Sequence, residues 1–118
     1  MDFEIADEFN VLMDNYELER VIDNTISNAI KYSFENTTVT ILLKNYQIEI
    51  INKGVKIDDT SLVFEKYYQE KVKNIGLGLG LNIVKSICDS YGITISVDSD
   101  EVTTFRYMFP NNLIKKES

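Results

Sequence analysis

Two segments of the chain carry apolar residues at the three- and four-residue spacing of an amphipathic helix. The first is Glu17–Ser33, preceded by Asn15 as a candidate N-cap, with apolar positions Leu18, Val21, Ile22, Ile26, Ala29 and Ile30. The second follows Gly80 and ends before Gly92, a residue suited to a left-handed cap. Its apolar positions are Leu81, Val84, Ile87, Cys88 and Tyr91. The pattern therefore predicts two helices.

Segments rich in β-branched and aromatic residues predict the strands. Asp2–Met13 has short apolar patches that suit a strand followed by a turn. Thr37–Lys44 and Gln47–Asn52 flank Asn45–Tyr46, which is the pattern of a hairpin. Apolar and polar residues also alternate on both sides of a predicted turn at Asp98–Glu101. This alternation indicates a closing hairpin with core positions Ile93, Ile95, Val97, Phe105, Tyr107 and Phe109.

The order of these elements predicts the fold class. Asp58, Asp59 and Thr60 offer an N-cap for a short helix over Leu62–Tyr68. The order is then strand, helix, hairpin, short helix, glycine loop, helix, hairpin. We expect one domain over residues 1–118, with an α+β fold built as a two-layer α/β sandwich. Its mixed, mostly antiparallel sheet is covered on one face by helices.

Composition narrows the chemistry that such a domain can perform. The 118 residues include no histidine and one cysteine, Cys88, which excludes histidine-based catalysis, most zinc sites and an intramolecular disulfide. The net charge of −7 argues against binding to nucleic acid. No apolar run approaches a membrane span and no signal peptide is visible, so we expect a cytoplasmic domain without membrane contact. Any chemistry then depends on Asn, Lys, Asp, Glu, backbone amides and a hard metal ion.

Three polar residues of the first helix form a stripe opposite its apolar positions. Asn24, Asn28 and Lys31 are spaced at i, i+4 and i+7, so they share one side of a helix. An amide oxygen can ligate magnesium, and an ammonium group can contact phosphate. A solvated helix face has the same pattern, so the stripe alone leaves both interpretations open.

The glycines Gly76, Gly78 and Gly80 open the second predicted helix. Glycines let a backbone approach a ligand closely, and a helix N-terminus presents free N–H groups to anions. The run lacks the Lys-Ser/Thr ending of a Walker loop, since Leu81–Asn82 follows, and it lacks the preceding strand of a dinucleotide fold. Both common phosphate-loop interpretations are therefore disfavoured.

Four motifs in order are more specific than any one of them. They are Asn28–Ser33 (NAIKYS), Gly54 after the hairpin, Val63–Tyr68 (VFEKYY) and Gly76–Lys85 (GLGLGLNIVK). This series resembles the ATP-binding catalytic domain of bacterial two-component sensor histidine kinases, which shares a superfamily with type II topoisomerases, Hsp90 and MutL. The resemblance covers roughly residues 10–110. The aromatic set Phe64, Tyr67 and Tyr68 points to the kinases within that superfamily.

The resemblance implies ATP and magnesium as cofactors and a role for each motif. Asn28 would ligate magnesium, with Asn24 assisting, and Lys31 would contact phosphate. Tyr32 would pack near the adenine or ribose. The residues implied in ATP binding are Asn24, Asn28, Lys31, Tyr32, Asn52, Gly54, Phe64, Gly76, Leu77, Gly78, Leu79 and Gly80. Within that set, Gly54 would lie beneath the base, Phe64 would anchor a flexible lid, and the three later glycines would supply the hinge and the amides around the phosphates.

The sequence departs from the family pattern at several positions. Asn52 stands where the family usually has an aspartate that accepts from the adenine amino group. Loss of that charge-assisted bond costs about 1–2 kcal/mol, so we predict weaker ATP binding or relaxed base selectivity. Lys56 replaces a glycine, and Gln69 replaces a common arginine. The lid, residues 69–75, is short for the family, although its Lys71 and Lys73 offer positive charge.

The leading interpretation is a domain that binds magnesium-ATP and donates the γ-phosphate to a histidine on a separate helical dimerisation domain of the same parent protein. A response regulator would be the next partner. Autokinase activity by this chain alone is excluded because it has no histidine. The alternatives are a degenerate regulatory module of the same fold that binds nucleotide weakly or not at all, and an anti-sigma-type serine kinase or ATPase.

Family members usually carry a further strand and helix before the asparagine-bearing helix. About sixteen residues precede that helix here, so we expect a domain truncated at its N-terminal strand and helix. The apolar surface that such a helix would cover would then be exposed and would favour self-association. Membrane anchoring of the parent protein stays open.

Overall fold

A computed structural model describes residues 2–5, 8–64 and 80–115 of the chain. Its main sheet has five strands in the order β1-β3-β4-β6-β5. β1 (Asp2–Ile5) runs parallel to β3 (Thr40–Lys44), and every other neighbouring pair is antiparallel. The remaining strands are β4 (Gln47–Asn52), β5 (Thr94–Ser99) and β6 (Thr103–Met108). The predicted mixed, mostly antiparallel sheet is thereby confirmed.

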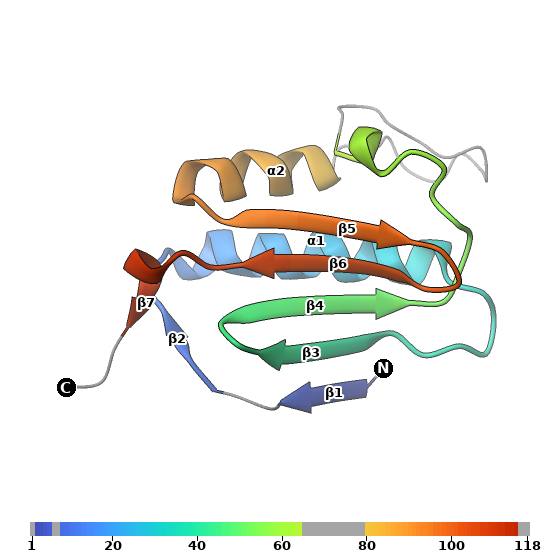
Figure 1. Ribbon diagram of the computed structural model, residues 1–118, viewed down its shortest axis with the longest axis horizontal. Coiled ribbons are helices and arrows are strands. Elements are labelled where there is room, and N and C mark those ends of the chain that lie inside the picture. The colour runs from blue at the N-terminus through green and yellow to red at the C-terminus, as the bar shows by residue number, and fades with distance from the viewer. Residues whose placement is uncertain (1, 6–7, 65–79, 116–118) are drawn as a thin grey trace.

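Two long helices, α1 (Asn15–Tyr32) and α2 (Gly80–Tyr91), pack side by side against one face of this sheet (Figure 1). Two short 3-10 helices, η1 (Thr60–Leu62) and η2 (Asn111–Leu113), accompany them. The arrangement is the two-layer α+β sandwich that the pattern predicts. Within the described ranges no helix is long and apolar enough to cross a membrane.

The start of the chain differs from the prediction of one strand over Asp2–Met13. It contains two separate strands, because β2 (Asn10–Val11) leaves the main sheet and pairs with β7 (Ile114–Lys115). The ring of Phe9 lies edge-on to the rings of Tyr46 and Phe109, at centroid distances of 5.5 and 5.9 Å. This aromatic contact holds the chain against the end of the sheet, where it turns towards α1.

Both predicted hairpins form. At the first turn, Asn45 and Tyr46 have φ angles of 52° and 60°, so two consecutive residues adopt the left-handed region, as in the turns that match strand twist. The second turn lies later than predicted. β5 continues through Ser99, and the N–H of Asp100 donates to the carbonyl oxygen of Val102 at 3.0 Å.

The inner face of α1 is narrower and more polar than its apolar residues suggest. The buried positions are Val21, Thr25 and Ala29, one helical turn apart. Ile30 belongs to the predicted apolar side of this helix, but its side chain is 55% exposed. Thr25 takes an inner position because its hydroxyl has hydrogen-bond partners there, on Val21 and Tyr107. The Val21 carbonyl, one turn earlier in the helix, and the Tyr107 hydroxyl, on β6, therefore take the place of water as hydrogen-bond partners of the Thr25 hydroxyl.

The caps differ from the prediction at one helix end. Asp14, and not Asn15, caps α1, since its Oδ2 accepts from the N–H of Glu17 at 3.0 Å. Both residue types are good caps, and only the backbone conformation separates them. Gly92 adopts φ +73° after α2, as predicted, and the N–H of Ile93 donates to the carbonyl oxygen of Cys88 at 2.9 Å. Among the described residues of the predicted Leu62–Tyr68 helix, only the start is helical, as η1.

The first turn of α1 and the last turn of α2 are tied together. The Tyr91 hydroxyl donates to Glu17 Oε1 at 2.8 Å and accepts from the N–H of Asp14 at 3.3 Å. The opposite face of the sheet has a polar tie of its own, because Arg106 on β6 donates to Glu49 on β4 at 3.1 Å. This bond to Glu49 is the main cause that raises the pKa of the Arg106 guanidinium.

Candidate functional site

The polar stripe of α1 lies on the flank that faces α2. Asn24 and Asn28 are half-buried and Lys31 is exposed. Nδ2 of Asn24 donates to the carbonyl oxygen of Gly80 at 3.3 Å, so the asparagine motif touches the first residue of α2. A freely solvated helix face would not make this contact. The two motifs are adjacent in the fold although 56 positions separate these residues in the sequence.

Gly54 lies directly against the C-terminal end of α1. A Cβ at this position would overlap the carbonyl oxygen of Tyr32, a backbone atom that cannot move aside. The same carbonyl accepts from the N–H of Val55 at 3.2 Å, and the N–H of Phe34 donates to the carbonyl oxygen of Lys53 at 3.0 Å. The segment after β4 is therefore joined to the end of α1 by backbone hydrogen bonds, and glycine is required for the close approach.

Asn52 is the last residue of β4, and its side chain points to the helix side of the sheet with only 4% exposure. Within the described residues no hydrogen bond engages its carboxamide. Its partner across the sheet is Thr103 of β6, which is also buried. Thr103 Oγ1 lies 2.7 Å from Ser99 Oγ, which accepts from the N–H of Ile57 at 2.9 Å. Two adaptable polar groups, an amide and a hydroxyl, thus adjoin each other at this end of the sheet.

Sequence reasoning did not identify Thr103 or Ser99 as candidate site residues. The signal was present, because strict alternation along β6 places Thr103 on the same face as Phe105 and Tyr107. A threonine at the end of an otherwise apolar core face is a polar group that needs partners or a ligand. We add Thr103 to the candidate site for this reason.

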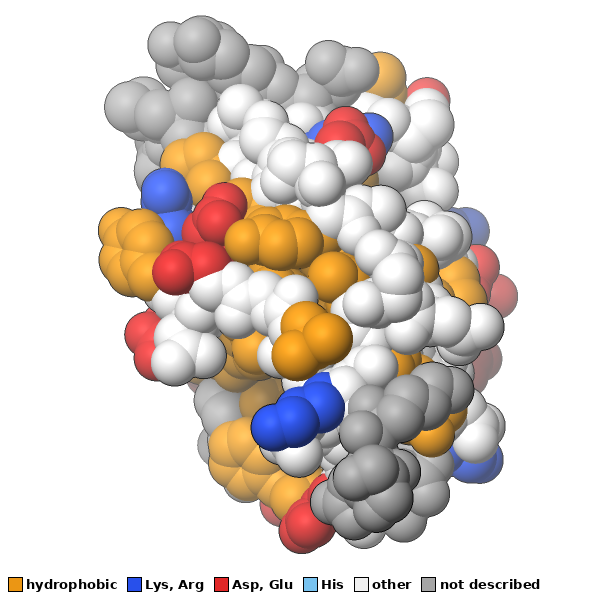
Figure 2. All heavy atoms as spheres, turned by 90° about the vertical axis from the view of Figure 1, so that its left-hand side faces the viewer, with side chains coloured by type: hydrophobic (Ala, Val, Ile, Leu, Met, Phe, Trp, Pro, Cys, Tyr) orange, Lys and Arg blue, Asp and Glu red, His pale blue; other side chains and the backbone are white. Residues whose placement is uncertain are grey.

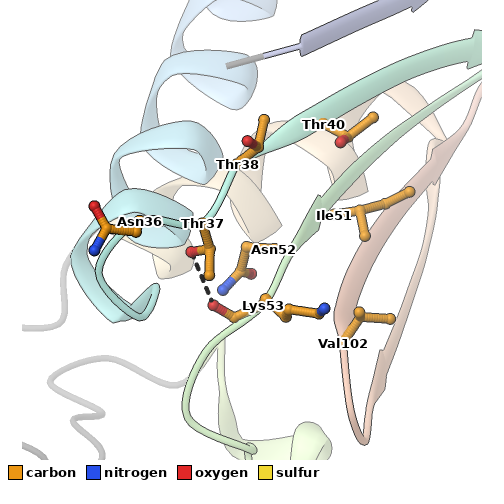
Figure 3. A pocket seen from close by; sticks show the side chains of 8 residues that line it. All are labelled: Asn36, Thr37, Thr38, Thr40, Ile51, Asn52, Lys53 and Val102. Carbon is orange, nitrogen blue, oxygen red and sulfur yellow. Dashed lines mark hydrogen bonds between the residues drawn. The ribbon is translucent and has the colours of Figure 1, made fainter.

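Asn52 also lines a cavity of about 340 Å³ at the end of the hairpin (Figure 3). In this view Thr37 and Lys53 lie close together, with the Thr37 hydroxyl 3.4 Å from the Lys53 carbonyl oxygen, while its shorter hydrogen bond, at 2.5 Å, goes to the carbonyl oxygen of Phe34. The full lining is Asn36, Thr37, Thr38, Thr40, Ile51, Asn52, Lys53 and Val102. Of the candidate ATP-binding residues, Asn52 is the one that belongs to this lining, so the cavity is not the whole site.

Phe64 packs against the core. Its ring meets that of Phe105 edge-on, with centroids 5.9 Å apart and an interplanar angle of 85°. Phe64 is the last described residue before the gap at residues 65–79. The remaining predicted positions lie outside the described residues: Tyr67, Tyr68, Gln69, Lys71, Lys73, Gly76, Leu77, Gly78 and Leu79.

Two further residues have surface or core roles. Lys56 Nζ lies 4.0 Å from Asp100 Oδ1, with both side chains largely exposed, which fits a surface lysine that pairs with the second hairpin turn. Cys88 is fully buried, and this burial raises the pKa of its thiol to about 12. The thiol is then protonated at neutral pH, so Cys88 is a core residue and not a nucleophile.

The polar side chains along α1 suit a metal ion that is bound partly by the protein and partly by the phosphates of a nucleotide. In the described part of the chain no three His, Cys, Asp or Glu residues come together as a metal site. The neutral amide oxygens of Asn28 and Asn24 could complete the coordination of a magnesium ion whose charge is balanced by phosphate oxygens. The residues present therefore fit a magnesium-nucleotide complex better than a free metal ion.

Taken together, α1 contacts the start of α2 through Asn24, and its C-terminal end contacts the segment after β4, within one α+β sandwich. The model of the family described as histidine kinase-, DNA gyrase B-, and HSP90-like ATPase matches residues 13–113. The chain belongs to this family.

Named relatives are sensor histidine kinases. The chain is 35% identical over 98 residues to sensor histidine protein kinase HK06 of Streptococcus pneumoniae serotype 2, a match that covers 79% of this chain and 22% of that protein. It is 33% identical over 120 residues to histidine kinase P4 of Formosa agariphila, covering 89% of this chain and 9% of that protein. The chain thus spans a small part of the length of these relatives.

Solved structures agree with the fold. The mycobacterial sensor histidine kinase MprB superposes with a TM-score of 0.76 at 25% identity, over 90% of this chain and 80% of that one. The catalytic domain of histidine kinase ThkA, in a nucleotide-free form, gives a TM-score of 0.74 at 25% identity, over 92% of this chain and 76% of that one. The described strands and helices are therefore those of a histidine kinase catalytic domain, as the sequence resemblance indicated.

Proposed function

We propose that this chain is the part of a sensor histidine kinase that binds magnesium-ATP and donates the γ-phosphate to a histidine on a separate helical dimerisation domain. One observation carries the proposal. The Asn24–Gly80 hydrogen bond and the close approach of Gly54 to Tyr32 set Gly80, the last of the three later glycines, and the segment after β4 against the helix that carries the asparagine motif. Such convergence of distant motifs is expected of a ligand site and not of a general scaffold.

The proposal gives each described residue a task. The amide oxygen of Asn28, with Asn24 beside it, would hold magnesium, which neutralises charge on the triphosphate. Lys31 would contact a phosphate, and Tyr32 would pack near the adenine or ribose. Asn52, together with Thr103, would meet the base. In a chain with a net charge of −7, Lys31 and the metal carry most of the attraction for a polyanion.

Catalysis in this proposal rests on positioning and charge neutralisation, since little covalent chemistry falls to the protein in phosphoryl transfer. The acceptor histidine must come from elsewhere because the chain has none. The proposed partners are accordingly the dimerisation domain of the parent protein and a response regulator. The proposed location is the cytoplasm, the compartment in which both partners and ATP are available together.

A second candidate is a regulatory module that has lost nucleotide binding. It is favoured by Asn52 in place of the family aspartate and by Lys56, whose ammonium pairs with Asp100 on the surface. A third candidate is a serine kinase or stand-alone ATPase of the same superfamily. The three differ in whether nucleotide binds and in which side chain receives phosphate.

Titration with magnesium-ATP separates the first two candidates. Saturable binding that is lost in Asn28→Ala supports the kinase proposal, and no binding at millimolar nucleotide supports the regulatory module. Incubation with labelled ATP and a histidine-containing helical hairpin then tests phosphoryl transfer. Phosphate on that partner that is stable to alkali and labile to acid marks phosphohistidine, whereas acid-stable phosphate indicates a serine kinase.

A further inference from the structure

The main sheet has two edge strands, β1 and β5, and they differ in how well they are protected against pairing with another chain. An edge strand presents unpaired N–H and C=O groups, and natural proteins protect it with charged residues, proline, bulges or short length. β1 has four residues, and two of them, Asp2 and Glu4, are acidic. β5 has six residues, of which only Asp98 is charged, and it contains neither lysine nor proline. β5 is therefore the less protected edge.

The backbone of β5 is regular along its whole length. Its six residues pair with the six residues of β6 in unbroken antiparallel register, so the strand has no bulge. Alternate residues of such a strand direct their N–H and C=O groups to the free edge. Within the described residues, no backbone hydrogen bond apart from those of the β5–β6 ladder involves Thr94–Asp98. The segment before η1 contacts the last residue of the strand, since the N–H of Ile57 donates to Ser99 Oγ at 2.9 Å.

The helix layer extends past this edge. In Figure 1 α2 lies beyond β5, on the side away from β6, and the two elements are in contact. A strand added to β5 would lie about 4.8 Å further out and would continue the sheet beside α2. Ile95 and Val97 of β5 are paired with buried Tyr107 and Phe105, so they lie on the helix side of the sheet. Both are only half-buried, and hydrophobic residues of an added strand would cover them further.

Acidic side chains gather at the end of β5. The side chain of Asp98 is 74% exposed, and that of Asp100, in the following turn, is 90% exposed. Glu101 is exposed as well. Arg106 lies 3.5 Å from Asp98, and Lys56 lies 4.0 Å from Asp100, but ion pairs this exposed to solvent are weak. The edge therefore attracts a chain that carries lysine or arginine.

The charge of the chain also argues against a second copy as the occupant. A second copy would bring a further net charge of −7 to an edge that is already acidic. The end of the molecule that carries β2 and β7 offers no comparable edge among the described residues, because each of these strands has two residues. Charged and other polar side chains also interrupt the hydrophobic ones at that end (Figure 2).

We propose that Thr94–Asp98 of β5 is a strand-addition site for an extended segment of another protein, in which hydrophobic residues alternate with lysine or arginine. The backbone of this segment hydrogen-bonds to the outward N–H and C=O groups of β5. Its hydrophobic side chains pack beside Ile95 and Val97, and its basic side chains lie on the other face, near Asp98. None of these residues belongs to the candidate ATP-binding set, so the proposal stands apart from the proposed function.

The test uses synthetic peptides of about nine residues in which valine alternates with lysine in one peptide and with glutamate in the other. Fluorescence anisotropy measures the affinity of each for the full chain, and amide hydrogen exchange maps the contact. We expect the lysine peptide to bind at least about tenfold more tightly than the glutamate peptide. In its complex, alternate amides of Thr94–Asp98 should exchange at least about tenfold more slowly, because a paired N–H is protected.

Two N-methylated forms of the lysine peptide test the backbone pairing directly. One form has N-methyl groups on its valines and the other on its lysines, so each form blocks one edge of the peptide and keeps its charge. Because a strand pairs with β5 along one edge, one form should lose affinity at least about tenfold and the other should keep most of it.

Variants assign the charge preference to this edge. Asp98→Ser/Glu101→Ser removes two negative charges beside β5 and should weaken the lysine peptide about fivefold or more. Asp2→Ser/Glu4→Ser is the matched control, since it removes two negative charges from the other edge strand and gives the same net charge. The control should leave the affinity for the lysine peptide unchanged.

Four results would overturn the proposal. The first is equal affinity for the lysine and glutamate peptides, or no binding at about 1 mM. The second is the same affinity for both N-methylated forms. The third is slower exchange along β1 in place of β5, or an equal loss of affinity in the control variant. The fourth is a dimer in sedimentation without peptide in which the same β5 amides are protected, because the occupant is then a second copy.

Discussion

The hydroxyl oxygens of Thr25 and Tyr107 lie 2.6 Å apart where α1 meets β6, and both side chains are fully buried. Thr25 Oγ1 is also 2.7 Å from the carbonyl oxygen of Val21, which can only accept. The single Thr25 proton therefore goes to Val21, and Tyr107 donates to Thr25. This directed chain of two hydrogen bonds fixes the rotation of α1 on the sheet. Burial is also the main cause that raises the pKa of the Tyr107 phenol.

The direction of these bonds predicts unequal effects for the two partners. Thr25→Val keeps the shape of the side chain but leaves the buried Tyr107 hydroxyl without an acceptor, at a cost of about 1–3 kcal/mol. Tyr107→Phe removes the donor and leaves Thr25 bonded to Val21, so about 1 kcal/mol is expected. Urea denaturation measures both free energies of unfolding. Thr25→Ser is the control that keeps the hydroxyl, and a larger loss in Tyr107→Phe than in Thr25→Val would refute the assigned direction.

Replacing Asn52 by aspartate is expected to change the affinity for nucleotides. If the base lies against this buried carboxamide, Asn52→Asp adds a charged acceptor for the adenine amino group, and ATP should bind about tenfold more tightly. Guanine offers a carbonyl oxygen at the same place, so GTP affinity should fall and the ATP to GTP ratio should rise. Isothermal titration with each nucleotide gives both values. Unchanged ATP affinity together with an unchanged ratio would mean that Asn52 does not meet the base.

Gly54→Ala should damage both stability and the nucleotide site. The added Cβ overlaps the Tyr32 carbonyl, so the segment after β4 must move away from α1, and overpacking of this kind costs about 1–3 kcal/mol. Gly92→Ala is a matched control, since φ of +73° is also unfavourable there, but the added Cβ would lie 3.9 Å from its nearest neighbour, Pro110 Cγ, which is an ordinary van der Waals contact. Both variants should lower the melting temperature. Weaker ATP binding is expected in Gly54→Ala alone, and equal weakening in both would argue against a local role.

The buried thiol of Cys88 is expected to make the fold less stable at alkaline pH. The pKa of its thiol is about 12 in the fold against 9.0 when unperturbed, so the unfolded chain releases this proton first as pH rises. The contribution of this pKa shift to the free energy of unfolding is fully present below pH 9. It is lost as pH rises towards 12, at up to about 1.4 kcal/mol per pH unit. Urea denaturation at pH 8, 9 and 10 measures the slope. Cys88→Ala should have a shallower slope between pH 9 and 10, and an identical slope would exclude the thiol as the source.

The hairpins and both helices could be predicted because each depends on a local pattern. The turn at Asn45–Tyr46 and the cap at Gly92 depend only on residues close together in the sequence. The order of the four motifs was enough to indicate the family. The inward position of Thr25 could not be predicted, because it depends on a tyrosine supplied by a distant strand. The departure of β2 from the main sheet depends in the same way on pairing with β7 at the other end of the chain. Thr103 was overlooked because polar residues at strand ends are common.

The candidate site also has a consequence for the order in which the molecule folds. β3–β4 and β5–β6 are local hairpins, but they join each other only where β4 pairs with β6. Asn52 and Thr103 are the last pair between β4 and β6. The chain between these two residues must therefore close into a long loop before they meet. Loop closure of this kind is slower than hairpin formation. A nucleotide bound where β4 pairs with β6 would bind only the state in which the two hairpins are paired, and it would slow their separation. Nucleotide binding and folding would then stabilise each other.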